Sequence, residues 1–354
     1  MKVCLERGFR DRDFIQTLER FLFCVVGSIH PPDRVISYVK YVPAENGLWG
    51  RNDVRFRRIM RRYTMLDLID TLKFLEQYPE YLYYSHAMGI KMSAVPVEKI
   101  LSHFKPEEKM RWLTEAKRGE LDPLERKALD LALKISDESG VPLENFGVTG
   151  SILLGIHQPF SDIDLTVYGV ENSRRVKEAL TQIYSNRAAD LQRFSGAKAE
   201  EWCLNKLRLY PLTYEEARTL LNRKWNIGLF QGTAFSMHPV KFEHEIKEKY
   251  GERVFRPIGI VKITATVIDD SESDFMPAKY LVEEVKVLEG LQVNDIREVA
   301  SYEGLYAGVA NRGERIVAYG KLERVVDNKR GEEYHRVLIG SQEARGKDYV
   351  KPLL

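Results

Sequence analysis

The chain has 354 residues, of which 44% are hydrophobic and 30% charged, and its formal net charge is +2. This composition is typical of a globular protein with room for two or three domains, and it excludes a chain that stays disordered for lack of hydrophobic residues. Because the charges nearly balance, any affinity for nucleic acid must come from local basic patches. The high charged share favours a thermophilic source.

The cysteines and the N-terminal residues indicate the cellular compartment of the protein. The three cysteines, Cys4, Cys24 and Cys203, are odd in number and lack the spacing of metal ligands, so we expect reduced thiols. No apolar run approaches the length of a membrane span, and the first dozen residues are too charged for a signal peptide. We therefore expect a cytoplasmic protein with no membrane partner; the sequence does not indicate an oligomeric state.

Residues 1–105 predict an N-terminal α/β accessory region. Apolar runs at 21–27 and 35–42 predict two strands joined by a loop, and a helical pattern follows over 53–75. This helix would carry a cluster of five arginines, namely Arg55, Arg57, Arg58, Arg61 and Arg62. The cluster would either grip the phosphates of RNA or of a nucleotide, or form a solvated helix face balanced by nearby acids.

Residues 106–250 predict a central core of strands and helices. Asp122 and Pro123 are good first residues of a helix that ends at Gly140. A buried strand is expected over 146–148, a tight turn at 150–151, a short helix over 152–156 and a second strand over 162–167. An amphipathic helix is expected from 172 or 173 onward. A further helix starts near Thr213, which forms a capping box with Glu216.

The turn and the second strand of this core carry the candidate chemistry. Asp162 and Asp164 are two residues apart, so in a strand they project from the same side. Two carboxylates held so close repel each other unless a cation lies between them, and oxygen ligands with open positions suit Mg²⁺. Gly150 leaves room for a phosphate, and the N–H groups after it favour anions. Together these features predict a site for a metal–nucleoside triphosphate.

The sequence Gly150-Ser151, a spacer of ten residues and then Asp162-Ile163-Asp164 resembles the signature of the DNA polymerase beta-like nucleotidyltransferases, including archaeal-type members. The resemblance covers about residues 122–187. It implies that Asp162 and Asp164 are catalytic and hold Mg²⁺ (or Mn²⁺), and that Gly150 and Ser151 bind the phosphates of an NTP. The implied reaction moves an NMP to an acceptor hydroxyl and releases pyrophosphate. We prefer an RNA 3′ end, such as that of tRNA, as acceptor; a protein or a small molecule is an alternative.

A third acid of that family has no clear counterpart here. The family usually places it on a later strand, and the candidate strand 234–240 offers Ser236 and His238 instead. Glu243 lies just beyond. The third catalytic position therefore stays open among Ser236, His238 and Glu243. The missing acid also motivates an alternative function, a catalytically inactive nucleotide- or RNA-binding protein on the same fold.

Residues 251–354 predict a β-rich C-terminal domain. Strands are expected at 261–267, 280–288, 316–326 and 334–339, with glycine-marked turns. Short strands of this kind suit a small barrel similar to the OB fold, which either binds RNA or braces the core. The candidate RNA-binding residues are Lys321, Arg324, Arg330, Arg336, Tyr306 and Tyr319. The expected fold class is thus α+β, with a central nucleotidyltransferase-type mixed sheet flanked by helices.

Overall fold

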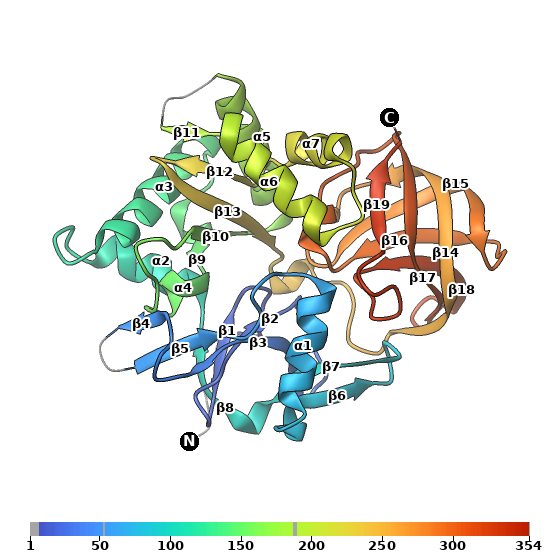
Figure 1. The fold of residues 1–354 in the computed structure, drawn as a ribbon, viewed down its shortest axis with the longest axis horizontal. Helices are drawn as coiled ribbons and strands as arrows, with labels where there is room; N and C mark the ends of the chain where they lie inside the picture. The colour runs from blue at the N-terminus through green and yellow to red at the C-terminus, as the bar shows by residue number, and fades with distance from the viewer. Residues whose placement is uncertain (1–6, 52–53, 187–189, 354) are drawn as a thin grey trace.

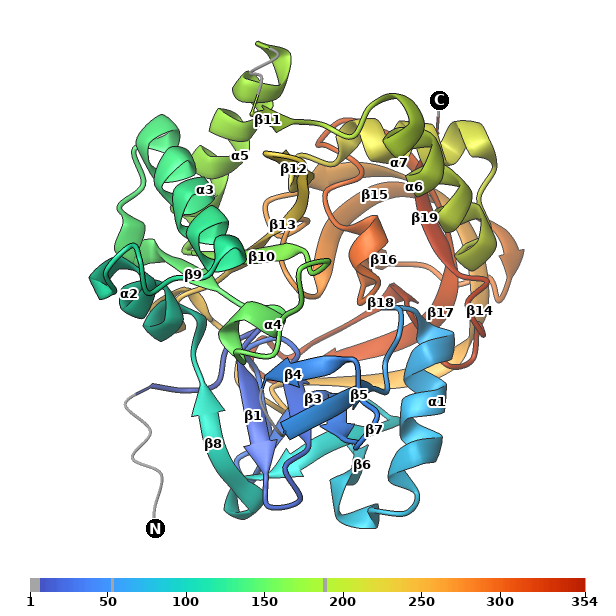
Figure 2. The same cartoon turned by 60° about the vertical axis from the view of Figure 1, so that its left-hand side comes forward.

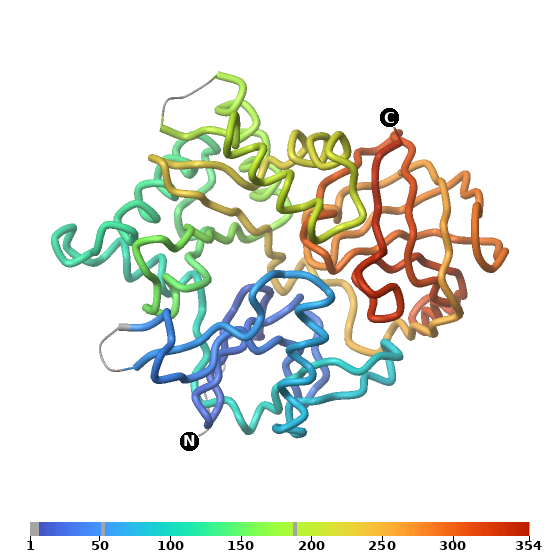
Figure 3. Tube along the Cα trace, viewed as in Figure 1, coloured from blue at the N-terminus to red at the C-terminus, as the bar shows by residue number. Residues whose placement is uncertain are grey.

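The computed structural model describes residues 7–51, 54–186 and 190–353. Over these residues the fold is α+β and contains three separate β-sheets, as Figure 1 shows. The chain completes each sheet before it begins the next, which can be followed along the trace in Figure 3. Each sheet has its own cluster of buried apolar side chains. The α+β class is therefore confirmed.

The N-terminal sheet is built mainly from antiparallel pairs in the order β4-β5-β3-β2-β1-β8, and β7 joins it by pairing with β3 and β6. Its strands are β1 (Phe14–Thr17), β2 (Leu22–Val25), β3 (Arg34–Pro43), β4 (Trp49–Arg51), β5 (Val54–Arg58), β6 (Leu82–Ser85), β7 (Ile90–Pro96) and β8 (Ile100–Phe104). The two strands expected at 21–27 and 35–42 are confirmed as the antiparallel pair β2–β3.

The helix expected over 53–75 is wrong in its first half. Residues 54–58 form β5, and the helix α1 (Met65–Leu75) begins only after Thr64, whose hydroxyl caps it. The sequence of β5 alternates, so Phe56 is buried while Arg55 and Arg57 face solvent, and this period of two fits a strand. The five arginines of the cluster therefore lie on β5 and on the loop after it, and not on the face of a helix. Asp53, the expected first residue, lies outside the described residues.

The central sheet has the order β11-β12-β13-β10-β9, in which only the described pair β10–β13 is parallel. Its strands are β9 (Phe146–Val148), β10 (Ile163–Tyr168), β11 (Leu191–Gln192), β12 (Ile227–Phe230) and β13 (Thr233–Val240). The helices of this region are α2 (Pro106–Glu115), α3 (Pro123–Ser139), α4 (Gly150–Leu153), α5 (Val170–Ser185), α6 (Gly196–Leu209) and α7 (Tyr214–Arg223). The predicted N-cap at Asp122 and the predicted capping box at Thr213 are both confirmed.

One face of strand β10 packs into the apolar core, and the other carries Asp164, one of the predicted site residues. Ile163, Leu165 and Val167 are fully buried and belong to the apolar cluster beneath α3 and α5. Because side chains alternate along a strand, Asp164 projects to the opposite face. Asp162 directly precedes the strand instead of starting it, and α4 begins at the glycine of the turn, two residues earlier than expected.

The C-terminal sheet has the order β14-β15-β16-β18-β17-β19, and β14 also pairs with β17. Its strands are β14 (Arg253–Asp269), β15 (Ala278–Gly290), β16 (Ile296–Ser301), β17 (Arg315–Asp327), β18 (Glu332–Ile339) and β19 (Tyr349–Pro352). The four strands expected from sequence lie within β14, β15, β17 and β18, whereas β16 and β19 were not predicted. The long strands β14 and β17 pair over most of their length.

The three sheets surround a common centre, which Figure 2 shows from a second side. Short 3₁₀ helices connect several elements: η1 (Pro79–Tyr81), η2 (Val97–Lys99), η3 (Leu143–Asn145), η4 (Glu243–Glu245) and η5 (Gly304–Tyr306). No helix in the part of the chain that the structure describes is both long and apolar enough to cross a membrane.

Candidate functional site

A cavity of about 770 Å³ lies between the three sheets, and all three contribute residues to its lining. The central sheet contributes Gly150, Asp162 and Asp164 together with Ser236 and His238. Five of the seven sequence-predicted site residues therefore share one cavity, although they come from a turn, the start of β10 and the middle of β13.

The turn at Gly150 lies directly against Asp164. Gly150 has a φ of +67°, a left-handed conformation that favours glycine, and a Cβ at this position would lie 2.5 Å from Oδ2 of Asp164. The backbone N–H of Thr149 donates to the carbonyl of Asp164 at 2.9 Å. The glycine is thus required both by the backbone conformation and by the carboxylate next to it.

The two aspartates interact electrostatically and differ in pKa. Asp162 is reached by solvent but lies within the cavity, and reduced hydration together with the negative charge of Asp164 raises its pKa to about 6. For Asp164, burial alone would raise the pKa, but His238, Lys40 and Ser236 lower it well below its ordinary value. Two carboxylates that repel each other within one cavity are a suitable oxygen donor set for a divalent cation.

Ser236 and His238 complete a hydrogen-bonded chain to Asp164. The parallel register of β10 and β13 places Ser236 opposite Asp164, and its hydroxyl donates to Oδ1 of Asp164 at 2.5 Å. Nε2 of His238 lies 2.8 Å from the same hydroxyl. Burial and the positive charge of Arg12 lower the pKa of His238, so the ring is neutral near pH 7. These two residues occupy the strand on which a third acid was sought.

The remaining two predicted residues lie elsewhere. Ser151 is buried and does not line the cavity. Glu243, on η4, forms an ion pair with Arg10 at 2.5 Å and is also absent from the lining. Of the three candidates for the third position, the structure therefore brings Ser236 and His238 to the aspartates and leaves Glu243 at a different contact.

Positively charged side chains of the N-terminal region line the cavity, and only some of them were candidates from the sequence. Arg58, Arg61 and Arg62 belong to the predicted arginine cluster and do line it, but Arg12 and Lys40 carried no signal in the sequence. The hydroxyl of Thr149 donates to the carbonyl of Arg12 at 2.6 Å and so joins the N-terminal sheet to the turn before Gly150. Only the folded chain brings these distant residues together.

Comparison with known proteins identifies the family. The chain is 33% identical over 348 residues to the uncharacterized protein MJ1086 of Methanocaldococcus jannaschii, and the alignment covers 97% of this chain and 98% of that protein. The chain belongs to the MJ1086 family. No family model matches the chain, and no solved structure matches it significantly.

A second group of possible metal ligands in this MJ1086-family chain lies at the start of α3. Single ligand atoms of Asp122, Glu125 and His157 lie within 4.8 Å of one another. Nε2 of His157 is 2.7 Å from Oδ2 of Asp122, and Glu125 accepts from Lys109 and from the backbone N–H of Asp122. Because these atoms already take part in the helix cap and its contacts, we interpret the group as structural.

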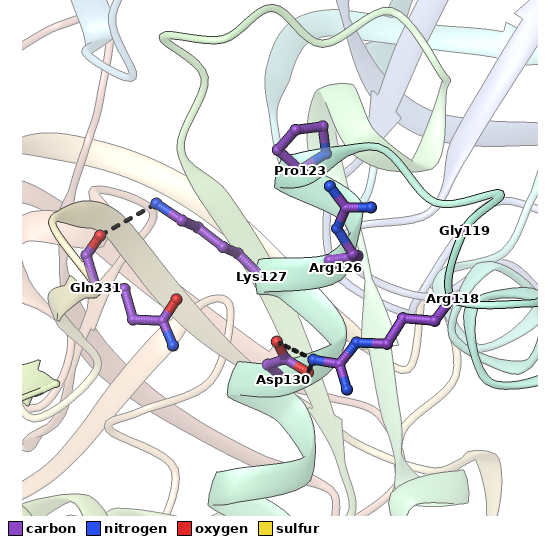
Figure 4. A pocket seen from close by; sticks show the side chains of 7 residues that line it. All are labelled: Arg118, Gly119, Pro123, Arg126, Lys127, Asp130 and Gln231. Atoms are coloured by element: carbon purple, nitrogen blue, oxygen red, sulfur yellow. Dashed lines mark hydrogen bonds and ion pairs between the residues drawn. The ribbon is translucent and has the colours of Figure 1, made fainter.

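A shallower depression of about 560 Å³ on the outer surface joins α3 to the turn before β13, as Figure 4 shows. Arg118 pairs with Asp130 at 3.3 Å, and Nζ of Lys127 donates to the carbonyl of Gln231 at 3.1 Å. The charges of Arg118, Asp130 and Lys127 are thus engaged with neighbouring protein groups, and none of the predicted site residues lines the depression.

The RNA-binding face expected on the C-terminal domain is wrong in composition. Lys321 and Arg336 are buried and pair with Glu323 at 2.9 and 2.8 Å, and Tyr306 is fully buried. Arg324 is exposed and pairs with Glu333 at 3.1 Å. Alternation along β17 and β18 places Lys321 and Arg336 on the face opposite to the apolar cluster of this sheet, where they line the central cavity and the buried Glu323 compensates their charge. The six residues do not form one exposed face.

Proposed function

We propose that this protein is a metal-dependent nucleotidyltransferase that moves an NMP from an NTP to an acceptor hydroxyl. The observation that carries the proposal is the contact between the glycine turn and Asp164, with Asp162 in the same cavity. This is the relationship that the resemblance to the DNA polymerase beta-like nucleotidyltransferases requires. The arrangement of β9, β10 and β13 beneath α3 and α5 supports a core of that type.

The donor set fits a magnesium or manganese ion. Asp162 and Asp164 would hold it, because both line the cavity and the charge of one raises the pKa of the other, a repulsion that a cation relieves. When bound, the ion would activate the acceptor hydroxyl and stabilise the leaving pyrophosphate. Gly150 lines the cavity next to the carboxylate of Asp164, and the cavity volume admits a nucleotide.

The acceptor we propose is an RNA 3′ end, for which the arginines of 55–62 that line the cavity supply phosphate contacts. The C-terminal strands support an OB-like unit: their pairing runs β14-β15-β16-β18-β17 and returns to β14, with β16 and β18 parallel. A protein or small-molecule acceptor would use the same core.

The test is incorporation of label from α-³²P-NTPs into total RNA with Mg²⁺, comparing wild type with Asp162→Asn and Asp164→Asn. Asparagine keeps the shape of each side chain but removes the charge that binds the cation. We expect a loss of at least about a hundredfold in labelling. Equal labelling by wild type and variants would refute the assignment of the carboxylates.

One observation favours a second function, nucleotide or RNA binding without catalysis. The residue opposite Asp164 on β13 is Ser236, and no acid among the described cavity residues of β13 replaces it. Calorimetry with Mg·NTP, followed by an assay for pyrophosphate, separates the two functions. Tight binding that requires Asp164 but gives no pyrophosphate with RNA, protein or small-molecule acceptors would establish the second.

A further inference from the structure

A buried ammonium group of the N-terminal sheet lines the same cavity as the two aspartates. Lys40, on β3, is 5% exposed and lines the cavity. The negative charge of Asp164 acts on it, and the rings of Phe14, Tyr41 and Tyr63 lie 5.3, 5.6 and 5.1 Å from its Nζ. Lys40 is therefore enclosed by aromatic faces on the protein side and open to the cavity.

This ammonium group lacks the acceptors that a buried charge normally has. Across 7–51, 54–186 and 190–353, Lys40 forms no ion pair within 4.0 Å and no hydrogen bond to a described acceptor. Lysine carries three N–H donors, and a buried charge is costly unless it is paired. The rings compensate part of that cost through cation–π contacts but accept no conventional hydrogen bond. An anion in the cavity would satisfy the remaining donors.

Arg12 adds a second incompletely paired cation on the same side. It lines the cavity, its positive charge acts on His238, and its buried Nε has no hydrogen-bond partner in the part of the chain described. Its closest acid is Asp11, whose Oδ2 lies 3.3 Å from Nε. The backbone of Arg12 has a φ of +71°, an uncommon conformation for a residue with a side chain. It is held by the hydrogen bond from Thr149 at 2.6 Å and by one to Val25 at 3.2 Å.

We propose that Lys40 and Arg12 form a phosphate-binding subsite that the N-terminal sheet supplies to the core. The inference rests on the proposed function, because the ligand is a substrate phosphate that lies between these cations and the metal held by the aspartates. Phosphate fits this position since its oxygens bind a hard cation and accept hydrogen bonds from ammonium and guanidinium groups at once. The N-terminal region thereby contributes directly to substrate binding.

The first test measures anion binding without metal. Tripolyphosphate is titrated by calorimetry, in the presence of EDTA, into wild type, Lys40→Met and Arg12→Gln. We expect wild type to bind and each variant to bind at least about tenfold more weakly, the loss typical of a charge-assisted hydrogen bond. The matched control is Lys73→Met, on the exposed face of α1 where Lys73 pairs with Asp70 at 3.3 Å, and it should bind like wild type. No binding by wild type, or equal binding by wild type and Lys40→Met, would overturn the subsite.

A second readout separates a ligand-binding lysine from a structural one. If Lys40 is kept for a ligand, Lys40→Met should unfold at the same or a higher temperature than wild type without ligand, because an incompletely paired buried charge has been removed. A lower unfolding temperature together with unchanged tripolyphosphate affinity would show that Lys40 only braces the aromatic rings, and the inference would be wrong.

Further titrations identify the source of the phosphate and isolate the proposed function. If the subsite holds the nucleotide tail, tripolyphosphate competes with Mg·ATP; if it holds a phosphate of the acceptor, inorganic phosphate and Mg·ATP bind together. Either result supports the subsite. Asp164→Asn should keep metal-free tripolyphosphate binding while losing the magnesium-dependent binding of ATP. If Asp164→Asn keeps both but Lys40→Met still weakens tripolyphosphate, the proposed function fails and the subsite stands.

Discussion

The hydroxyl of Ser236 donates a 2.5 Å hydrogen bond to Oδ1 of Asp164 from the adjacent parallel strand. Serine has one hydrogen, and because it goes to the carboxylate, Nε2 of His238 must carry the hydrogen that it shares with Ser236 at 2.8 Å. The chain His238–Ser236–Asp164 therefore orients Oδ1 of Asp164. Oδ2 lies on the side of Gly150, where a side chain would collide with it.

Replacing Ser236 by Ala should weaken metal binding without unfolding the protein. The substitution removes the hydrogen bond that orients Asp164 and helps to lower its pKa. Removal of such supporting partners typically lowers metal affinity by about 10- to 100-fold. Titration of Mn²⁺, followed by electron paramagnetic resonance, measures this. Ser185→Ala, which removes an exposed hydroxyl that donates to the carbonyl of Thr181 on α5, is the control. Equal Mn²⁺ affinities for wild type and Ser236→Ala would contradict the orienting role.

Gly150→Ala and Gly155→Ala form a matched pair, because the two glycines have nearly equal φ values of +67° and +65°. A Cβ at Gly155 meets nothing within 4 Å, whereas one at Gly150 lies 2.5 Å from Asp164. Both variants should lose about 1 kcal/mol of unfolding free energy from backbone strain. Only Gly150→Ala should also lose Mg·ATP binding, since the new methyl group displaces the carboxylate. Urea unfolding and calorimetry measure the two effects; similar Mg·ATP affinities in both variants would rule out the contact as the cause.

The parts of the site that are close in sequence could be predicted, and those brought together by packing could not. The glycine turn and the two aspartates lie within fifteen residues, where local chain geometry limits how they are arranged. The aspartate strand was recognisable because Ile163, Leu165 and Val167 alternate with polar residues. Lys40 and Arg12 reach the aspartates from more than a hundred residues away, and no local pattern in their own strands indicates that contact.

The two clear errors both concern which side chains of a strand are buried. Residues 54–58 were read with a helical period, although Phe56 is buried between exposed arginines as in a strand. On the C-terminal sheet, Lys321 and Arg336 were expected at the surface because charged residues usually are. They are buried with Glu323 instead, and a lone sequence does not reveal which charges are paired in the interior.

Replacing His157 by Asn should reduce stability and leave metal binding unchanged. His157 contacts the cap of α3 through Asp122 at 2.7 Å, and loss of a buried contact of this kind costs on the order of 1–3 kcal/mol. Because the ligand atoms of this group already have protein partners, we expect Mn²⁺ to bind at Asp162 and Asp164 alone. Mn²⁺ titration of His157→Asn and Asp162→Asn checks this. Lower Mn²⁺ stoichiometry in His157→Asn would show that the group at α3 is a metal site.

Glu303 should make the protein less stable as the pH rises from 5 to 8. Burial raises the pKa of this carboxyl group from 4.5 to about 7. Below pH 4.5 it is protonated in both the folded and the unfolded state. Between 4.5 and 7 the unfolded chain releases the proton while the folded chain keeps it, so the unfolding free energy falls with pH, and above 7 the loss is complete. A shift of this size corresponds to roughly 3 kcal/mol.

Glu303→Gln should remove this loss, because its amide stays neutral at every pH. The carboxyl accepts from the N–H of Met65 at 2.8 Å and from the hydroxyl of Tyr210 at 3.0 Å. In the variant, the Tyr210 hydroxyl can donate to the carbonyl of Tyr63, which lies at 3.2 Å, and accept from the new amide. Urea unfolding across pH 5–8 should therefore show Glu303→Gln gaining on wild type as the pH rises. Glu171→Gln is the control: the hydrogen bond from Arg174 lowers the pKa of this exposed carboxyl, which stays ionised throughout the range, so its difference from wild type should be constant. A constant difference for Glu303→Gln as well would mean that Glu303 is ionised in the folded protein at pH 5.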